Sequence, residues 1–491
     1  MPAAGYDPSL TYSATIGFLY VFNLIVGTGA LALPKAFQTA GWLLSPLLLC
    51  ISCLVSYVCA TFVLESLSIA NAVNSKRKRE EEEGPAAAGG NDELAPHAFE
   101  ITQRVEVSEM ASMFLSRVEI AISYIALNLY LFGDLAIYST TVSKSFMNIV
   151  CSSMNGTAID ATSPCREWLP SMISRFVAYR ISVLLFIAMT SPMVIAGITK
   201  TKYIQLVTTI SRWSAFSIMI ILAIAALLER GPAAHPPAMN VHGFGSLFGV
   251  TVYAFMCHHS LPSLIAPMSN KTGVFAKLAG IYILVLAFYF TLSVTGAFAF
   301  EKVQDVYTLN FLHDEYTTPL YFLVDHFLAL FPVFTLSTNY PIVAITLINN
   351  VRVLRDLTFP KSQSEDTERL VDEEEQVPVT TSRSPSRTER RLSDVIIPVV
   401  VIGLPTIISL CSDNVLFLAT ATGSYPGVGV QFVIPCMLIL RARGYAAREL
   451  GTQAPEHCAS PFEGTAAPVA ILAWAAFAII MTTLNLAGFS F

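Results

Sequence analysis

The sequence predicts an all-α polytopic membrane protein with about eleven transmembrane helices, and its composition and apolar runs support this fold class. Of the 491 residues, 54% are apolar and only 13% are charged, whereas soluble domains carry about 25% charged residues. The mean hydropathy is +0.59. Such a chain cannot cover a water-soluble surface, which excludes a soluble enzyme. A net charge of −6 provides no basic face for a nucleic acid.

Eleven segments have the length and composition of a membrane-spanning helix, which needs roughly 20 apolar residues. They cover residues 13–37, 43–70, 114–147, 177–198, 203–228, 246–268, 276–300, 320–348, 394–412, 414–440 and 466–489. Runs of this length favour helices, because the strands of membrane barrels alternate in segments of about ten residues. The first run lacks a basic leader and a small-residue cleavage site, so we interpret it as the first span.

Two charged stretches divide the chain. We expect transmembrane helices 1–2 in residues 1–72, helices 3–8 in residues 113–348 and helices 9–11 in residues 394–491. Residues 73–112 and 349–393 are predicted to be disordered cytoplasmic loops, because nearly half of the charged residues lie in or beside them. These loops either bind cytoplasmic regulators or only orient the neighbouring spans.

The loop charges predict a cytoplasmic N-terminus, because most Lys and Arg residues then lie in cytoplasmic loops. Asn155 begins a glycosylation sequon in a loop that would face the other side. Cys151 and Cys165 flank it and either form a disulfide, which would stabilise the loop by about 3 kcal/mol, or stay as separate thiols. The sequence leaves open a plasma-membrane or an endolysosomal location.

Two predicted spans are interrupted near their middle by residues that are poor helix formers. The first contains Gly27-Thr28-Gly29 followed by Pro34, and the sixth is interrupted over Tyr253 to Ser263, a stretch that includes Pro262. Irregular backbone at this depth survives only where it lines a cavity. Broken helices at matching positions of two five-span halves predict an inverted-repeat transporter with its substrate site at the midplane.

The chemistry of the two breaks suits an α-amino acid. A half-helix that begins near Thr28 presents unpaired N–H groups and the positive end of its dipole, which together favour a carboxylate. We expect the substrate ammonium group to bind carbonyl groups near Phe255 to His258.

The stretch Asn23 to Gly41, with its Gly-Thr-Gly, Leu-Pro, Ala-Phe and Gly-Trp elements, resembles the first helix of the amino acid/auxin permease family. Phe255 to Pro262 resembles the sixth helix of that family. The family belongs to the amino acid–polyamine–organocation superfamily. The resemblance implies a leucine-transporter-like inverted repeat of five plus five helices, in which helices 1 and 6 are broken. It also implies secondary active transport of a small neutral amino acid by alternating access, coupled to Na⁺ or H⁺.

The resemblance further implies roles for individual residues. Asn23 corresponds to a residue that holds substrate and sodium, and Gly27 and Gly29 correspond to glycines that contact the substrate carboxylate. Phe255 matches an aromatic lid over the substrate. The predicted substrate-binding residues are Asn23, Gly27, Thr28, Gly29, Phe255, Cys257 and His258. The predicted ion-coupling residues are Asn23, Ser337, Thr338, Asn339 and Asp134.

Asp134 lies within the third span, where a carboxylate costs about 3 kcal/mol or more unless it faces a cavity or a partner. It is either a proton or cation site, or a charge that is paired with a basic residue or lies at an interface. His258 and His259 either carry protons or donate neutral hydrogen bonds that close the break. We expect no cofactor and no metal ion beyond Na⁺, because adjacent histidines without further ligands do not form a zinc site.

Two other functions are compatible with the sequence. An amino-acid sensor or scaffold without transport activity would signal through the charged loops. A membrane-embedded enzyme could use the histidine pair, but the sequence lacks a carboxylate dyad, a nucleophile motif and a metal-ligand set, so we expect no enzyme. The expected partners are a small amino acid, Na⁺ or H⁺ and the lipid bilayer, without nucleic acid.

Overall fold

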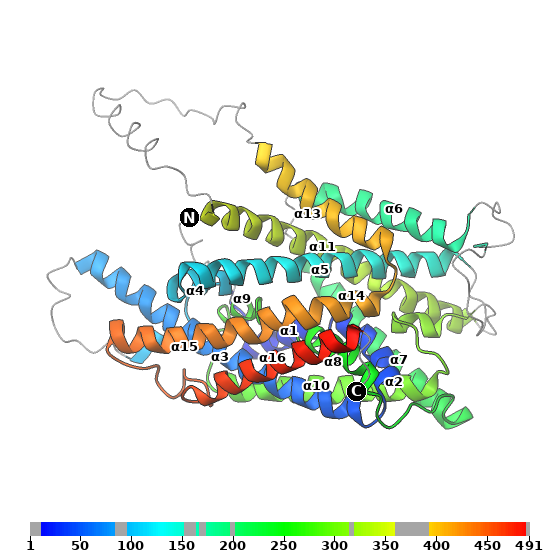
Figure 1. Ribbon diagram of the computed structural model, residues 1–491, viewed down its shortest axis with the longest axis horizontal. Helices are drawn as coiled ribbons and strands as arrows, with labels where there is room; N and C mark the ends of the chain where they lie inside the picture. The colour runs from blue at the N-terminus through cyan, green and yellow to red at the C-terminus, as the bar shows by residue number, and fades with distance from the viewer. Residues whose placement is uncertain are drawn as a thin grey trace.

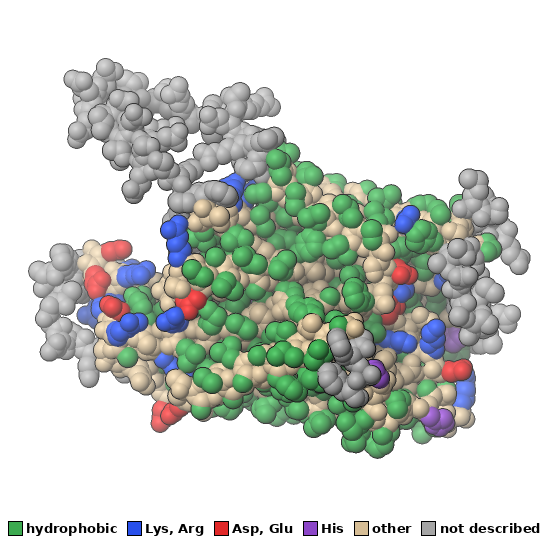
Figure 2. Space-filling model, viewed as in Figure 1, with side chains coloured by type: hydrophobic (Ala, Val, Ile, Leu, Met, Phe, Trp, Pro, Cys, Tyr) green, Lys and Arg blue, Asp and Glu red, His purple; other side chains and the backbone are tan. Residues whose placement is uncertain are grey.

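The computed structural model is almost entirely helical, and most helices run along the long axis of the molecule (Figure 1). It describes residues 11–83, 96–151, 164–165, 173–196, 202–313, 319–358 and 392–487. Figure 2 shows an apolar middle, with Lys, Arg, Asp and Glu gathered toward the two ends of the long axis. This distribution is the one expected of a helical bundle that crosses a bilayer.

The helical elements follow one another along the chain from α1 to α16. They are α1 (Ala14–Ile25), α2 (Thr28–Ala40), α3 (Leu44–Glu83), η3 (Pro96–Phe99), α4 (Val107–Phe114), α5 (Arg117–Val150), α6 (Arg175–Ile195), α7 (Lys202–Arg230), η4 (Val241–Gly243), α8 (Phe244–Ala254), α9 (Leu261–Ile265), α10 (Val274–Ala299), η5 (Tyr307–Phe311), α11 (Pro319–Thr358), α13 (Leu392–Cys411), α14 (Val415–Thr422), η6 (Gly423–Gly427), η7 (Gly429–Val433), α15 (Ile434–Tyr445), η8 (Ala446–Leu450) and α16 (Ala466–Leu486). The π-helical segments η6 and η7 connect α14 to α15.

Each of the eleven predicted spans overlaps a helix of the structure. Among the described residues, eight helices are long and apolar enough to cross a membrane, and the bent pair of α1 and α2 makes a ninth candidate. Helix α13 is shorter in its apolar part, and α8 and α9 are separated by a break. The all-α polytopic fold with broken first and sixth spans is confirmed, whereas the number of eleven spans stays a prediction.

The structure differs from the sequence prediction in the first charged stretch. Residues 73–83 continue α3, and residues 96–112 contain η3 and most of α4, with Phe99 and Met110 buried. The Ser68 hydroxyl on α3 donates a hydrogen bond to the carbonyl of Phe99 at 2.5 Å. Disorder over 73–112 is therefore wrong for these residues, because apolar side chains beyond the charged run pack against α3. Residues 84–95 and 359–391 lie outside the described part of the chain.

The helices of the bundle form two packed groups. Helices α5, α6, α11 and α13 pack against one another along one side of the molecule (Figure 1). Helices α2, α3, α8 and α10 pack together on the other side and bring the two broken spans next to each other. Helix α7 contacts α10 and α11, and α14 contacts α5 and α8, so these two helices join the groups.

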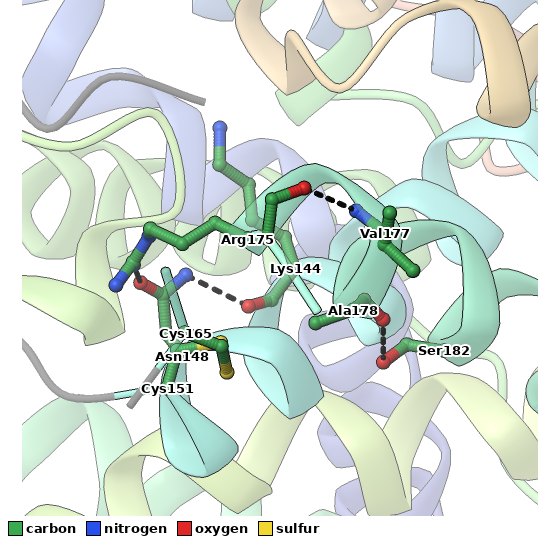
Figure 3. The surroundings of a disulfide bond; sticks show 9 residues. Lys144, Asn148, Cys151, Cys165, Arg175, Val177, Ala178 and Ser182 are labelled. Atoms are coloured by element: carbon green, nitrogen blue, oxygen red, sulfur yellow. Dashed lines mark hydrogen bonds between the residues drawn. A yellow bond between two sulfur atoms is a disulfide. The ribbon is translucent and has the colours of Figure 1, made fainter. Parts of the chain in front are cut away.

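The predicted disulfide between Cys151 and Cys165 is confirmed, and both cysteines are buried (Figure 3). We call the end of the bundle that holds it the disulfide end. Next to the bridge, the Asn148 carboxamide accepts a hydrogen bond from the guanidinium of Arg175 at 2.8 Å. The sequon residue Asn155 lies outside the described residues. We call the opposite end, where α3 carries residues 76–79, the basic end.

Candidate functional site

The first span is broken at Val26–Gly27, where the axes of α1 and α2 differ by 49°. In a continuous helix, the N–H groups of residues 27–29 would donate to the carbonyl groups of residues 23–25. Here the first hydrogen bond of α2 runs from the Ala30 N–H to the Gly27 carbonyl at 3.2 Å. None of the three amides of residues 27–29 has an acceptor among the described residues.

Side chains from two other helices donate hydrogen bonds to carbonyl groups that the break leaves without their helical partners. The guanidinium of Arg212 on α7 donates a hydrogen bond to the Asn23 carbonyl. The Tyr289 hydroxyl on α10 lies 2.8 Å from the Ile25 carbonyl and 3.0 Å from the carbonyl of Ala254, the last residue of α8. One tyrosine therefore connects the two helix ends at which the spans break.

The predicted residues of the second break pack against α10 and α3. The ring of Phe255 stacks on that of Tyr282, with centroids 6.2 Å apart. The Cys257 sulfur lies 3.3 Å from the Tyr282 hydroxyl, and the Nε2 of His258 lies 2.9 Å from the Ser56 carbonyl. Phe255, Cys257 and His258 are all buried. In this conformation their side chains therefore fix the backbone of the break to α10 and α3.

Asp134 is connected to the first break through one tyrosine. The Tyr253 hydroxyl on α8 donates a hydrogen bond to Asp134, and its oxygen lies 2.8 Å from the hydroxyl of Thr28, the first residue of α2. Asp134 and Thr28 are 6% and 7% exposed. No ion pair within the described residues neutralises Asp134, and the Tyr253 hydroxyl that donates to it is uncharged. The described residues therefore contain no basic partner for the paired-charge alternative, and the proton or cation site stays a prediction.

In the described part of the chain, no hydrogen bond connects the predicted ion-coupling residue Asn23 with those on α11. The Asn23 side-chain amide donates to the Thr209 hydroxyl at 2.9 Å, and its buried Oδ1 has no donor. On α11, the Thr338 hydroxyl donates to the Thr335 carbonyl, and the Ser337 hydroxyl is buried without a partner. No hydrogen bond within the described residues links Asn23 to this part of α11. The sodium site stays a prediction.

The sequence reasoning missed Arg212, Tyr253 and Tyr289. Arg212 could have been found, because it is the one charged residue in the apolar run 203–228 and ionisable residues at membrane depth commonly mark functional sites. The two tyrosines carry no such signal, because an aromatic residue in an apolar span is usually a packing residue. Their hydroxyl groups acquire partners only once the helices are packed.

Residues 11–462 match the family model described as transmembrane amino acid transporter protein. A Caenorhabditis elegans protein named transmembrane protein 104 homolog is 55% identical over 487 residues, which cover 98% of each chain. Human transmembrane protein 104 is 37% identical over 513 residues, covering 97% of this chain and 96% of the human one. The Dictyostelium discoideum homolog is 31% identical over 495 residues, covering 89% of this chain and 90% of that one.

Among solved structures, the crystal structure of MhsT in complex with L-phenylalanine superposes with a TM-score of 0.49 at 13% identity, covering 98% of this chain and all of that one. The chain belongs to the transmembrane amino acid transporter family, among relatives named transmembrane protein 104.

Proposed function

We propose that the protein is a secondary active transporter that moves a small neutral amino acid by alternating access, coupled to Na⁺ or H⁺. The observation that supports it most is the set of three neighbouring amides, residues 27–29, that the break leaves without acceptors among the described residues. They lie at the N-terminal end of α2, where the helix dipole adds a positive partial charge. A substrate carboxylate would accept their hydrogen bonds.

The second break completes the site in this proposal. It faces the first, because α2 packs on α8 and Tyr289 contacts the last residue of both α1 and α8. Backbone carbonyl groups near Phe255 to His258 would accept hydrogen bonds from the substrate ammonium group. Ring and sulfur contacts with Tyr282 hold this segment in place.

Coupling is proposed to involve Asp134. Its carboxylate reaches Thr28 through the Tyr253 hydroxyl, so the binding of a proton or a cation at Asp134 would change the hydrogen bonding at the start of α2. Ser337, Thr338 and Asn339 with Asn23 are the proposed ligands if the coupling ion is Na⁺. In the proposed orientation, the basic end is cytoplasmic and the disulfide end faces outside.

Uptake by proteoliposomes tests the proposal. Purified full-length protein is reconstituted and supplied with labelled neutral amino acids, under an inward Na⁺ gradient in one experiment and an inward H⁺ gradient in another. We expect accumulation that depends on one of the two gradients and is lost in Asp134→Asn. Binding without flux would support the amino-acid sensor instead. Neither binding nor flux would contradict both functions.

A further inference from the structure

Arg212 is a buried cation whose charge is not neutralised by a described residue. Its side chain lies on α7 and is 8% exposed. A guanidinium carries five N–H donors, and the hydrogen bond that the structure assigns to Arg212 is the one to the Asn23 carbonyl. No carboxylate forms an ion pair with it within the described part of the chain. Because an uncompensated buried charge is strongly unfavourable, this position calls for an anionic partner.

Arg212 lies at the first break itself. In a continuous helix, the Asn23 carbonyl would accept the N–H of Gly27. Arg212 donates a hydrogen bond to that carbonyl instead, and the Gly27 amide has no acceptor among the described residues. The guanidinium therefore binds the last turn of α1, on one side of the gap in the backbone, and the unpaired amides of residues 27–29 begin on the other side.

Two further polar atoms near Arg212 lack partners in the described part of the chain. A narrow crevice with no room for a water molecule in this conformation lies between Asn23, Arg212 and Trp213 and is bounded by Phe22, Phe216 and Phe288. The indole N–H of Trp213 and the Oδ1 of Asn23 are both buried without hydrogen-bond partners. The ring of Trp213 stacks on Phe22, with centroids 4.3 Å apart. The crevice therefore has aromatic walls and contains hydrogen-bond donors and one acceptor that lack partners among the described residues.

We propose that Arg212 binds the substrate carboxylate together with the amides of residues 27–29, and that Trp213 donates a further hydrogen bond to this group. The Asn23 Oδ1 accepts a hydrogen bond from the substrate ammonium group. The inference rests on the proposed function and adds a fixed charge to its carboxylate site. The ligand class is an α-amino acid with a free carboxylate, which enters when α1 moves away from α7 at the Val26–Gly27 break.

Such a site discriminates strongly against ligands that lack the carboxylate. An amine or an amino-acid amide would leave the guanidinium buried without its anionic partner, and sites with buried polar groups reject analogues that cannot pair them. The comparison of an amino acid with its own amide isolates this effect, because the side chain and the ammonium group stay the same.

The experiment measures ligand-induced thermal stabilisation of purified full-length protein. The probes are L-alanine, L-leucine and L-phenylalanine, their primary amides, and the amine-free acids propionate and 3-phenylpropionate. We expect at least one amino acid to stabilise the wild type while its amide does not. Arg212→Gln should weaken amino-acid binding by about 10- to 100-fold, as expected for hydrogen bonds to a charged group. The preference for acid over amide should then approach one.

Arg180→Gln is the matched control, because Arg180 is exposed on α6 with its guanidinium 3.9 Å above the Phe176 ring. It should leave every affinity unchanged. If Arg212→Gln does not fold, Arg212→Lys keeps the charge and loses the planar fork of donors. This variant should bind amino acids about tenfold more weakly and retain the preference for acid over amide.

The inference is overturned if Arg212→Gln leaves binding unchanged or weakens the acid and its amide equally, because the residue would then only support the helix. For Arg212→Lys, unchanged affinity or loss of the preference would overturn it. Arg212-dependent binding of the amine-free acids without binding of any amino acid would keep the inference and refute the proposed function. If none of the probes stabilises the wild type, both fail.

Discussion

Gly29 of α2 lies directly against the backbone of Ala254 of α8, so that a methyl group at position 29 would lie 2.5 Å from the Ala254 Cα. The two broken spans touch at this point. By contrast, a methyl group at Gly27 would meet nothing closer than 4.0 Å among the described residues. The two glycines, which the resemblance assigns to the same carboxylate, therefore differ in their structural role.

Gly29→Ala should destabilise the protein, because the added methyl group cannot be accommodated without separating α2 from α8. We expect the free energy of unfolding to fall by about 1–3 kcal/mol, as for overpacked cores. Thermal unfolding in detergent measures it. Gly27→Ala is the control and should unfold like the wild type, whereas the bulkier Gly27→Leu should fold and lose uptake. Wild-type stability of Gly29→Ala would contradict the close contact.

Tyr253→Phe should disconnect Asp134 from Thr28, because it removes the hydroxyl that contacts both. The carboxylate would lose a buried donor, which costs about 1–3 kcal/mol. We expect a lower unfolding temperature and loss of the response of uptake to the driving gradient. Tyr179→Phe serves as the control, because the buried Tyr179 hydroxyl donates to the Ser409 carbonyl, at 2.7 Å, outside the proposed site. Gradient-driven uptake by Tyr253→Phe at the wild-type rate would exclude this connection.

Glu65 and Arg443 join α3 to α15 near the basic end. The carboxylate accepts two hydrogen bonds from the guanidinium, at 2.8 and 2.7 Å, and the Glu65 side chain is 4% exposed. Arg443→Met would leave this buried carboxylate without its charged partner, although the Ser460 N–H still donates to it, and we expect a loss of about 3–5 kcal/mol in stability.

Arg441→Met on the same helix is the control for Arg443→Met. Arg441 pairs with Glu119 while 55% of its own side chain is exposed, and such surface pairs contribute about 0–1 kcal/mol. Thermal unfolding in detergent compares the two variants. Equal effects of the two substitutions would show that the Glu65 pair is not buried in the membrane-embedded protein.

His313, which follows η5, should make stability depend on pH. Its Nδ1 lies 2.8 Å from the Asp325 carboxylate, and this hydrogen bond raises the pKa of the His313 ring above its ordinary value. The protonated ring therefore stabilises the folded state below about pH 6.5, and this contribution is lost as the pH rises through the folded pKa. Unfolding temperatures measured from about pH 5.5 to about pH 8.5 should fall more steeply for the wild type than for His313→Asn. Parallel curves would contradict this assignment.

Asn155→Gln tests the proposed orientation. If the disulfide end faces outside, the sequon is accessible to glycosylation, and the wild-type protein from eukaryotic cells should migrate faster after glycosidase treatment. The variant should migrate like the treated wild type. An untreated wild type that already migrates with the variant would count against the orientation.

Much of the fold followed from the sequence, because membrane helices are specified by local composition. The apolar runs located the helices, and Gly27, Gly29 and Pro262 located the breaks. Phe99 and Met110 show the limit of this reasoning. They follow a charged run that resembles a disordered loop, yet they are buried next to α3, because a distant apolar surface is available to them.

The candidate site was predicted in part. Asp134 was recognised because a carboxylate within a span needs a partner, but nothing in its neighbourhood points to Tyr253, which lies 119 residues away along the chain. The same holds for Arg212 and the Asn23 carbonyl, separated by 189 residues. Such pairs depend on the rotation and tilt of each helix about its axis.

The sequence by itself determined that the chain is a helical membrane protein and where two of its spans break, because glycine and proline disrupt helices through their own backbone chemistry. Only the tertiary structure decided which side chains donate hydrogen bonds to the unpaired carbonyl groups at the break. It also decided that Gly29 rather than Gly27 is the glycine at a close helix contact. The hydrogen bonds that connect Asp134 to α2 through Tyr253 likewise depend on it. These features depend on where packed helices touch. A small rotation of a helix moves a side chain in or out of hydrogen-bonding distance without any change in sequence pattern.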